Sequence, residues 1–263
     1  MWADFLRGDM SVQLRRGIAL AAVVIAGSLL VSCSKEEPEP VPKPEGIDLE
    51  AAAEIGASGN GLWILDGVSA AGRVIDAMRA ADGGTMTASV HEMIPVEQGD
   101  PLPGRNISVV SSTDGTNLQA SFVVGDQTGE LVIIGNDVWV KGNGAFTERI
   151  GVSDDIDEFV CMARGSTSIT ELETLATPAG FLRSTLSGLE IGTLSPTEAE
   201  PDLQSLVLGV SAAPIGYVTV AAQGPPLPHQ VSAFDVTGSV EAQFTWGDVS
   251  EIQAPDGGAG GCS

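Results

Sequence analysis

Hydrophobic residues recur at helical spacing in the first part of the chain that reads as folded. Between residues 61 and 81 they stand three or four positions apart, at Leu62, Leu65, Val68, Ala71, Ile75 and Met78. Asp82-Gly83-Gly84 then ends the run. This spacing predicts an amphipathic helix over residues 61–81, although Gly67 and Gly72 lower its intrinsic stability.

The pattern changes to alternation after residue 84, which favours strands. Apolar and polar residues alternate over 85–91 and 117–124, residues 106–111 are rich in β-branched residues, and 131–134 and 138–140 are apolar. Short turn clusters at 125–129 and 135–137 separate the later segments. Short turns join antiparallel neighbours, so we expect an antiparallel meander here.

The centre of the chain returns to helical signals. Ser168-Ile169-Thr170-Glu171 has the form of a capping box ahead of Leu172 and Leu175. Thr177-Pro178 resembles a second helix start with proline at the first position, leading as far as Leu189. These signals predict two consecutive helices.

Strands resume over 203–210, 215–222, 231–236 and 240–246, with a proline-rich break at 224–228. The order of helix, strands, helices and strands predicts an α+β fold with one long antiparallel sheet and a helical insertion laid on it. Strand phase decides which side chains meet the helices. We expect Phe122, Val124, Phe244 and Trp246 on the helix-covered side, and Asn117, Gln119, Ser121, Glu241 and Gln243 on the other side.

The N-terminus carries export signals. Arg15 and Arg16 precede an uncharged apolar run from 17 to 31, which is shorter than the ~20 residues of a membrane-spanning helix. Leu30-Val31-Ser32-Cys33 has the form of a bacterial lipobox, at which Cys33 is lipidated. We therefore predict a lipoprotein signal peptide at 1–32, starting at Met1 or Met10, and a lipid anchor at the extracytoplasmic face of the cell membrane. The alternatives are a buried N-terminal helix or a signal anchor.

A tether and a tail flank the predicted folded domain. Pro38, Pro40, Pro42 and Pro44 favour an extended conformation, so residues 33–60 are predicted to hold the domain off the membrane. Residues 61–255 form the predicted domain, and 256–263 a glycine-rich tail. Outside the cytoplasm Cys161 and Cys262 are expected to form a disulfide, with two free thiols as the alternative. Neither cysteine has a partner at metal-ligand spacing.

Acidic residues dominate the charge, with 35 Asp and Glu against 12 Lys and Arg, a net charge of −23. Removing residues 1–32 takes away three arginines and two aspartates, which leaves about −24. Such a surface repels nucleic acid and anionic headgroups, so neither is an expected partner. General acidity of secreted proteins is the simpler explanation of the charge.

Catalytic signals are sparse. His91 and His229 are the only histidines, and the chain has no G-x-S-x-G motif, P-loop or Rossmann glycine set. Ser195 and Ser205 have no base that the sequence identifies. Asp154-Asp155-Ile156-Asp157-Glu158 lacks the glycine and distal glutamate of an EF-hand loop and is read as a solvated acidic loop. We predict no catalytic residue, metal or cofactor.

The element order, the lipobox and two segments carry a family resemblance. The segments are 137–146, which ends the meander, and the terminal set with Gly224-Pro225-Pro226-Leu227-Pro228 and Phe244-Thr245-Trp246-Gly247-Asp248. Over 61–255 the chain resembles the LolA-like envelope lipoproteins, especially the actinobacterial LppX and LprG-type branch. The resemblance implies an unclosed antiparallel half β-barrel with helices packed on its concave face and lipid acyl chains between them. This chain departs from the family in having few large aromatic residues.

The implied function is a membrane-anchored lipoprotein that binds or carries the acyl chains of a lipid or lipoglycan in the cell envelope. The lining residues expected from the pattern are Leu65, Ile75, Met78, Ala120, Phe122, Val124, Ala242, Phe244 and Trp246. If these stripes form a filled core instead, the alternative is an envelope interaction or regulatory module with a protein partner. A third alternative, a hydrolase, requires a serine or aspartate close to His91 or His229 in the fold.

Overall fold

The computed structural model describes residues 59–96, 99–151, 156–197 and 200–255. The predicted signal peptide, the lipidation site Cys33 and the glycine-rich tail with Cys262 lie outside these residues. So do Asp154 and Asp155 of the predicted acidic loop. Within the described residues no helix is long and apolar enough to cross a membrane.

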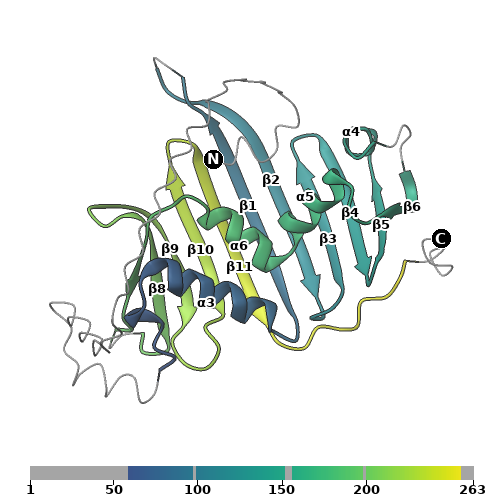
Figure 1. The fold of residues 1–263 in the computed structure, drawn as a ribbon. Helices are drawn as coiled ribbons and strands as arrows, with labels where there is room; N and C mark the ends of the chain where they lie inside the picture. Colours follow the sequence, from purple (N-terminus) through teal and green to yellow (C-terminus); the bar gives the residue numbers. More distant parts are fainter. Residues whose placement is uncertain (1–58, 97–98, 152–155, 198–199, 256–263) are drawn as a thin grey trace, which may run out of the picture.

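One antiparallel sheet of 11 strands forms the fold, in the order β6-β5-β4-β3-β2-β1-β11-β10-β9-β8-β7 (Figure 1). The strands are β1 (Gly84–Ile94), β2 (Leu102–Thr113), β3 (Leu118–Val124), β4 (Gln127–Ile134), β5 (Asp137–Gly142), β6 (Ile156–Ala163), β7 (Ile191–Leu194), β8 (Leu203–Val210), β9 (Ala213–Ala221), β10 (Pro228–Asp235) and β11 (Gly238–Trp246). The sheet is open, because β6 and β7 stand at its two ends. The predicted α+β class with an unclosed antiparallel sheet is confirmed.

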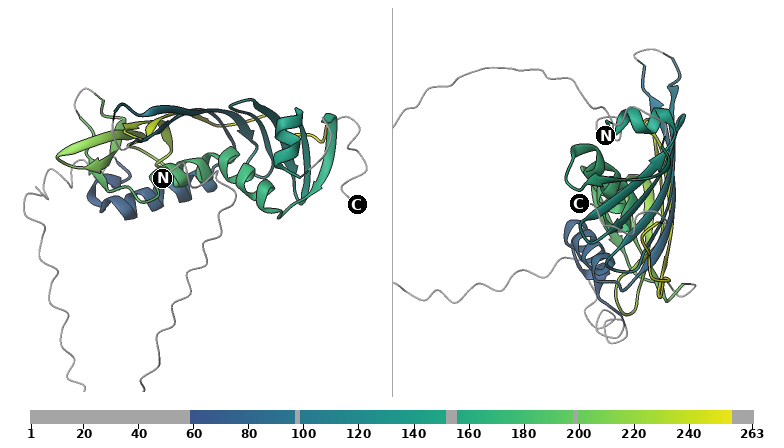
Figure 2. Two further views of the ribbon diagram at one scale, coloured as in Figure 1. Left: turned by 90° about the horizontal axis from the view of Figure 1, so that it is seen from above. Right: turned by 90° about the vertical axis from the view of Figure 1, so that its right-hand side faces the viewer.

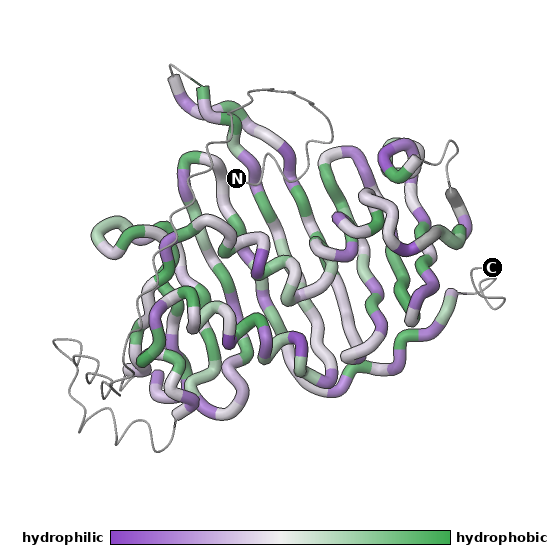
Figure 3. Tube along the Cα trace, in the orientation of Figure 1, coloured by the Kyte–Doolittle hydropathy of each residue, from purple (hydrophilic) through white to green (hydrophobic). Residues whose placement is uncertain are grey.

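Strand phase follows the sequence alternation, which appears as alternating colours along the strands in Figure 3. Phe122, Val124 and Phe244 are buried and Trp246 is half-buried. Gln119, Ser121, Glu241 and Gln243 are exposed, and Asn117 is half-buried. Glu241 and Gln243 lie one position from the buried residues of β11, so each strand places its apolar residues on one face.

Within the described residues, five helices accompany the sheet: the 3-10 helix η1 (Leu62–Ile64), α3 (Gly67–Arg79), α4 (Gly144–Arg149), α5 (Thr167–Ala176) and α6 (Pro178–Leu186). Helices α3, α5 and α6 lie on the same side of the sheet (Figures 1 and 2). Their buried residues join those of both halves of the sheet in one core, from Val74 and Phe181 to Phe122 and Phe244. We call this side of the sheet the covered face and the other side the open face.

The first helix begins later than predicted. Asp66 is its N-cap, and the Oδ1 atom of Asp66 accepts a hydrogen bond of 3.0 Å from the backbone N–H of Ser69. The buried stripe of α3 is Ala70, Ala71, Val74, Ile75 and Met78. Val68 is 76% exposed, so its place in the predicted stripe is wrong. Leu62 and Leu65 precede the cap, so they are not part of this helix.

Of the two helix starts predicted in the centre of the chain, one is confirmed and one is wrong. The N-cap of α5 is Ser166, whose Oγ accepts a 3.3 Å hydrogen bond from the N–H of Ile169, so the predicted capping box at Ser168 is wrong. Pro178 is the first residue of α6, as predicted. Helix α6 ends at Leu186 and does not extend to Leu189.

The sequence did not predict β6, α4 or β7. Helix α4 starts at the N-cap Asn143, and it places the Phe146 ring directly over Gly129 and Gly142. A Cβ atom at either glycine would overlap that ring, so the two glycines make room for the aromatic side chain. Strands β6 and β7 are the two edges of the sheet, where pairing with β5 or β8 on one side decides the conformation.

A second, smaller cluster lies on the open face. Val132 and Trp139 are paired across β4 and β5, and both pack with Ile252 from the C-terminal segment after β11. Asp114, in the turn between β2 and β3, accepts a 3.1 Å hydrogen bond from the backbone N–H of Ile252. The C-terminal segment is therefore held against the open face at the β2–β5 side of the sheet.

Candidate functional site

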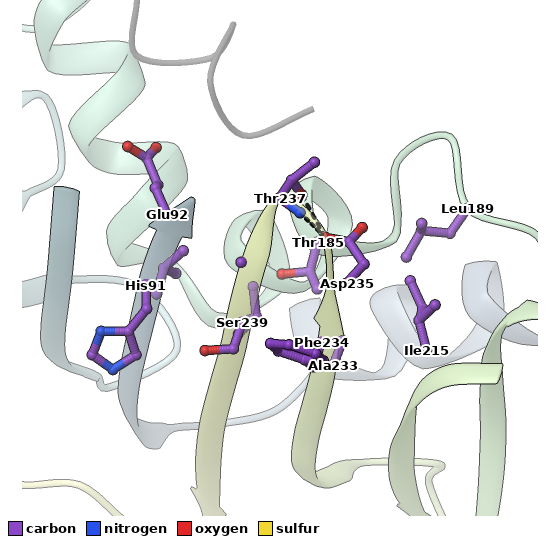
Figure 4. A pocket seen from close by; sticks show the side chains of 13 residues that line it. His91, Glu92, Thr185, Leu189, Ile215, Ala233, Phe234, Asp235, Thr237 and Ser239 are labelled. Carbon is purple, nitrogen blue, oxygen red and sulfur yellow. Dashed lines mark hydrogen bonds between the residues drawn. The ribbon is translucent and has the colours of Figure 1, made fainter. Parts of the chain in front are cut away.

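A pocket opens at one end of the sheet, between the covered face and the end of α6 (Figure 4). Its volume is about 50 Å³. The lining side chains on the covered side are mostly apolar, and they come from β1, α6, the segment after α6, β9, β10 and β11. They are Val90, Thr185, Leu189, Ile215, Ala233 and Val240. The mouth is formed by His91, Glu92, Phe234, Asp235, Thr237, Gly238 and Ser239.

Strand register brings the lining together. Val90 and Val240 are direct partners across β1 and β11, and Ala233 is the partner of Val240 across β10 and β11. Thr185 is buried, and its Oγ1 donates a 3.0 Å hydrogen bond to the carbonyl of Phe181 within α6. Because this hydroxyl is satisfied inside the helix, the pocket gains little polarity from Thr185.

Hydrogen bonds fix the polar residues of the mouth. Arg105 donates to both carboxylate oxygens of Glu92, at 2.8 Å and 3.0 Å. Asp235 Oδ1 accepts from the N–H and the hydroxyl of Thr237, at 2.7 Å and 2.6 Å. Gly238 has φ of +136°, and a Cβ there would overlap the carbonyl oxygen of His91. Only glycine fits this approach of β11 to β1.

A second hollow lies beside the same strand ends. Its volume is about 340 Å³. Its lining includes two exposed large apolar side chains, Phe234 (71% exposed) and Val236 (70% exposed), together with Met93 and Pro101. His91, Phe234, Asp235, Gly238 and Ser239 line both hollows. One end of the sheet thus carries two adjoining hollows with a common set of residues.

His91 has a serine near it in this arrangement. His91 Nδ1 lies 2.8 Å from Asn106 Oδ1, and Ser239 is the residue directly opposite His91 on β11. A nucleophile and its base need to be within hydrogen-bond reach. Among the hydrogen bonds of the described residues, none joins the hydroxyl of Ser239 to the His91 ring. His229, exposed in β10, lies outside the lining of both hollows.

The nine residues predicted to line a ligand site lie elsewhere on or beside the core. Met78, Ala120, Phe122, Val124, Ala242 and Phe244 are buried members of the main core, and Ile75 is buried on α3. Leu65 and Trp246 are half-buried and pack against that core. Trp246 Nε1 donates a 2.6 Å hydrogen bond to the carbonyl of Pro228, and its ring stacks on Phe244 with centroids 6.2 Å apart.

None of these nine residues lines the pocket of Figure 4. Their contact with a ligand therefore stays a prediction. The lining that sequence reasoning missed includes Thr185, Leu189 and Ile215, which come from three separate segments. The alternation of β11 marked Val240 as facing the covered side, but no sequence signal places the end of α6 against that strand.

The predicted disulfide can be placed at one of its two ends. Cys161 lies in β6 directly opposite Trp139, and paired residues share a face of the sheet. Trp139 belongs to the cluster that packs with Ile252 on the open face. The C-terminal segment therefore runs toward the side of the sheet that carries Cys161. Cys262 lies outside the described residues, so the pairing stays a prediction.

Metal chemistry finds no support in side-chain clusters. Within the described residues, no group of three or more His, Cys, Asp or Glu side chains is placed to hold a metal ion.

Two carboxylates have pKa values below the ordinary value of an aspartate. Hydrogen bonds from the backbone of Asn117 and Ile252 lower the pKa of Asp114 to about 2. The hydroxyl and backbone N–H of Ser69 lower the pKa of Asp66 below its ordinary value.

Comparison with known proteins gives structural likeness only. No protein-family model matches the chain, and no curated protein matches it. Among solved structures, the chain is similar to LprF from Mycobacterium bovis, at 9% identity over 71% of this chain and 94% of that one, with a TM-score of 0.34.

Two further structures are similar to this chain. A chain of the MucA/MucB complex of Pseudomonas aeruginosa matches at 12% identity over 71% of this chain and 58% of that one, with a TM-score of 0.30. A LolA superfamily protein from Nitrosomonas europaea matches at 11% identity over 74% of this chain and 97% of that one, with a TM-score of 0.27.

Proposed function

We propose that this chain is a lipid-anchored protein of the cell envelope that binds acyl chains of a lipid. The binding region is the space between the covered face, taken as the concave side of the half-barrel, and the helices laid over it. Acyl chains enter through the pocket between the end of α6 and strands β1, β9, β10 and β11.

The observation that carries this proposal is the position of that pocket. It lies at the end of a continuous apolar layer, in which Val90 and Val240 of the lining belong to the main core. A bound chain gains about 0.8 kcal/mol for each CH₂ group removed from water. A pocket that is continuous with the core offers a path along which successive CH₂ groups are buried.

The pocket is too small to hold an acyl chain in its present shape. Pockets that enclose small ligands usually measure about 300–1,000 Å³, whereas this one holds about 50 Å³. Binding of an acyl chain therefore requires that α6 and the segment with Leu189 move away from the strands. Helix α6 packs against α3 and α5, so such a movement opens the layer between helices and sheet without separating any strands.

Native mass spectrometry of the chain from Ser34 onward tests the proposal, because this form lacks the predicted signal peptide and acylation site and keeps every described element. We expect a co-purifying lipid on the parent protein. Ala233 is half-buried in the pocket lining, so Ala233→Trp should remove the lipid while changing the melting temperature little. A parent protein that carries no lipid after incubation with membrane lipids contradicts the proposal.

Ala120→Trp is the matched control for that variant. Ala120 is buried in the main core between β2 and β4, away from the pocket lining. In a filled core, overpacking costs about 1–3 kcal/mol. The control should therefore lower the melting temperature clearly. If Ala120→Trp instead removes lipid and leaves stability intact, the cavity extends to the residues predicted from the sequence.

Anchoring has a separate test. Cys33→Ala should leave the full-length precursor unlabelled by palmitate and uncleaved by the lipoprotein signal peptidase. Normal acylation of this variant contradicts the predicted lipobox at Leu30-Val31-Ser32-Cys33.

A second candidate is an envelope interaction module with a filled core. It is favoured by the burial of seven of the nine predicted lining residues and by the larger hollow beside Phe234 and Val236. A lipid-free parent protein, with Ala233→Trp and Ala120→Trp both destabilising, supports this candidate over the lipid carrier.

A further inference from the structure

We propose that one end of the sheet docks on the surface of a lipid bilayer through exposed apolar side chains of two neighbouring hairpins. These residues are Ile94, Val96, Leu102, Phe234 and Val236, which we call the apolar rim. The inference goes beyond the proposed function, because a surface that binds membranes does not require that the pocket hold a lipid.

Strand pairing brings the two hairpins together. Ile94 and Leu102 are direct partners at the end of the β1–β2 hairpin, and Glu92 of β1 is the partner of Gly238 at the start of β11. The turn between β10 and β11 therefore lies beside the far part of β1. The hollow of about 340 Å³ has lining residues from both hairpins, including Pro101 and Val236. Phe234 and Val236 of the rim therefore border a hollow that both hairpins line, and Ile94, Val96 and Leu102 lie further along the β1–β2 hairpin.

Ile94, Leu102 and Phe234 lie at strand ends, and Val96 and Val236 lie in the connecting turns, where Gly, Pro, Asn, Asp and Ser are the favoured residues. Each of its five members is a large apolar residue that is more than a third exposed. Single exposed apolar residues are common, whereas a cluster of them around a hollow marks an interaction site. Elsewhere in the sheet the exposed positions beside buried residues are often polar, as Glu241 and Gln243 show for β11.

Charge decides which kind of membrane fits. Glu92 is paired with Arg105, but Asp100 and Asp235 lie at the same end and make no ion pair within the described residues. The chain as a whole has a net charge of −23. Anionic headgroups are therefore repelled, and a zwitterionic surface is the matching one. Docking is driven by burial of apolar area and not by attraction between charges.

The predicted anchor permits this contact. Asn60, near the start of the described domain, is held to β9 by hydrogen bonds to the carbonyls of Ala221 and Ala222, both at 2.8 Å. The chain from Cys33 to Asn60 spans at most roughly 90 Å when fully extended. Eleven strands spaced about 4.8 Å apart span roughly 50 Å, so this length lets the rim meet the membrane that holds the predicted anchor at Cys33. The rim shares Phe234 with the lining of the pocket, so the end of the sheet that docks is also the end that carries the pocket.

Flotation with vesicles tests the inference on the chain from Ser34 onward. We expect the parent protein to float with phosphatidylcholine vesicles and to bind less when about a third of the lipid is phosphatidylglycerol. Phe234→Ser combined with Val236→Ser should reduce the bound fraction about tenfold. Val110→Ser combined with Val123→Ser is the matched control, because these two valines are exposed in β2 and β3 and do not belong to the rim. The control should bind as the parent does.

The outcomes separate this inference from the proposed function. Equal binding by the rim variant and the parent, or no binding of the parent to phosphatidylcholine, overturns the docking proposal. Lipid content is measured on the same samples by native mass spectrometry. A lipid-free parent that still binds vesicles through the rim overturns the carrier function alone. A parent that carries lipid but ignores vesicles overturns the docking alone. Binding that rises with phosphatidylglycerol contradicts the charge argument and overturns the proposal as stated.

Discussion

The two faces of the sheet belong to the same strands but differ in how far their side chains are buried. On the covered face, Ala120, Phe122 and Phe244 are buried beneath three helices as parts of one core. On the open face, Val110 and Val123 are exposed, and the C-terminal segment covers only the Val132–Trp139 region. The comparison shows that a strand residue is buried when another element packs on its face of the sheet, whichever strand it belongs to.

Truncation on the covered face should have the largest effect. Phe122 is 2% exposed, so Phe122→Ala should lower the free energy of unfolding by about 3–5 kcal/mol. Val123→Ala, one residue away on the open face, should change it by about 0.5 kcal/mol or less. Chemical denaturation of both variants measures the difference. Similar losses at the two positions would mean that the open face is also packed.

The predicted Cys161–Cys262 disulfide should have the next largest effect, on the open face. It closes a loop of about a hundred residues, for which chain entropy gives at most ~4.7 kcal/mol, and disulfides typically contribute about 2–4 kcal/mol. Cys161→Ser should therefore lower stability by that typical amount in exported protein. Peptide mapping without reductant checks the bond directly, and two free thiols would refute it.

Asp114 should give the smallest effect, at the other attachment of the C-terminal segment. Its pKa is lowered to about 2 from 3.8, chiefly by the Asn117 backbone N–H. The folded state thus favours the carboxylate, so this stabilisation is present above about pH 4 and is lost as the pH falls toward 2. Hydrogen bonds to Asp114 contribute about 1 kcal/mol at most, since water screens this site.

Melting temperatures of the parent and of Asp114→Asn between pH 5 and pH 2.5 test this contribution. The parent should lose more stability over that range than the variant. Equal losses would show that other carboxylates account for the acid sensitivity, among them Asp66, whose pKa is also lowered.

Sequence alternation predicted most of the covered face, for a physical reason. In β3 and β11 every second residue is apolar, and a period of two leaves only one way to bury Phe122 and Phe244. Helix α3 shows where such patterns become less certain. The predicted stripe included Val68, which lies exposed in the first turn, whereas the observed stripe includes Ala70 and Val74.

The pocket could not be predicted from spacing, because it depends on tertiary contacts. Thr185 belongs to α6, Ile215 to β9 and Val90 to β1, so the three residues meet only when the helix lies across the sheet end. The edge strand β6 was missed for a related reason. Its sequence, with Asp157, Glu158 and Cys161, has a weak strand signal. The antiparallel pairing with β5 is what makes this segment a strand.

The pairing of β1 with β11 has a consequence for how the protein folds. Strands β1 to β6 follow one another in both sequence and space, and so do β7 to β11. The seam between these two groups joins Gly84 to Trp246, which are 162 positions apart. Contacts between distant residues form slowly, because a long loop must close first. We expect two locally folded halves to form early, with Met86 and Phe244 facing solvent until the seam closes, which makes this step the one most exposed to aggregation.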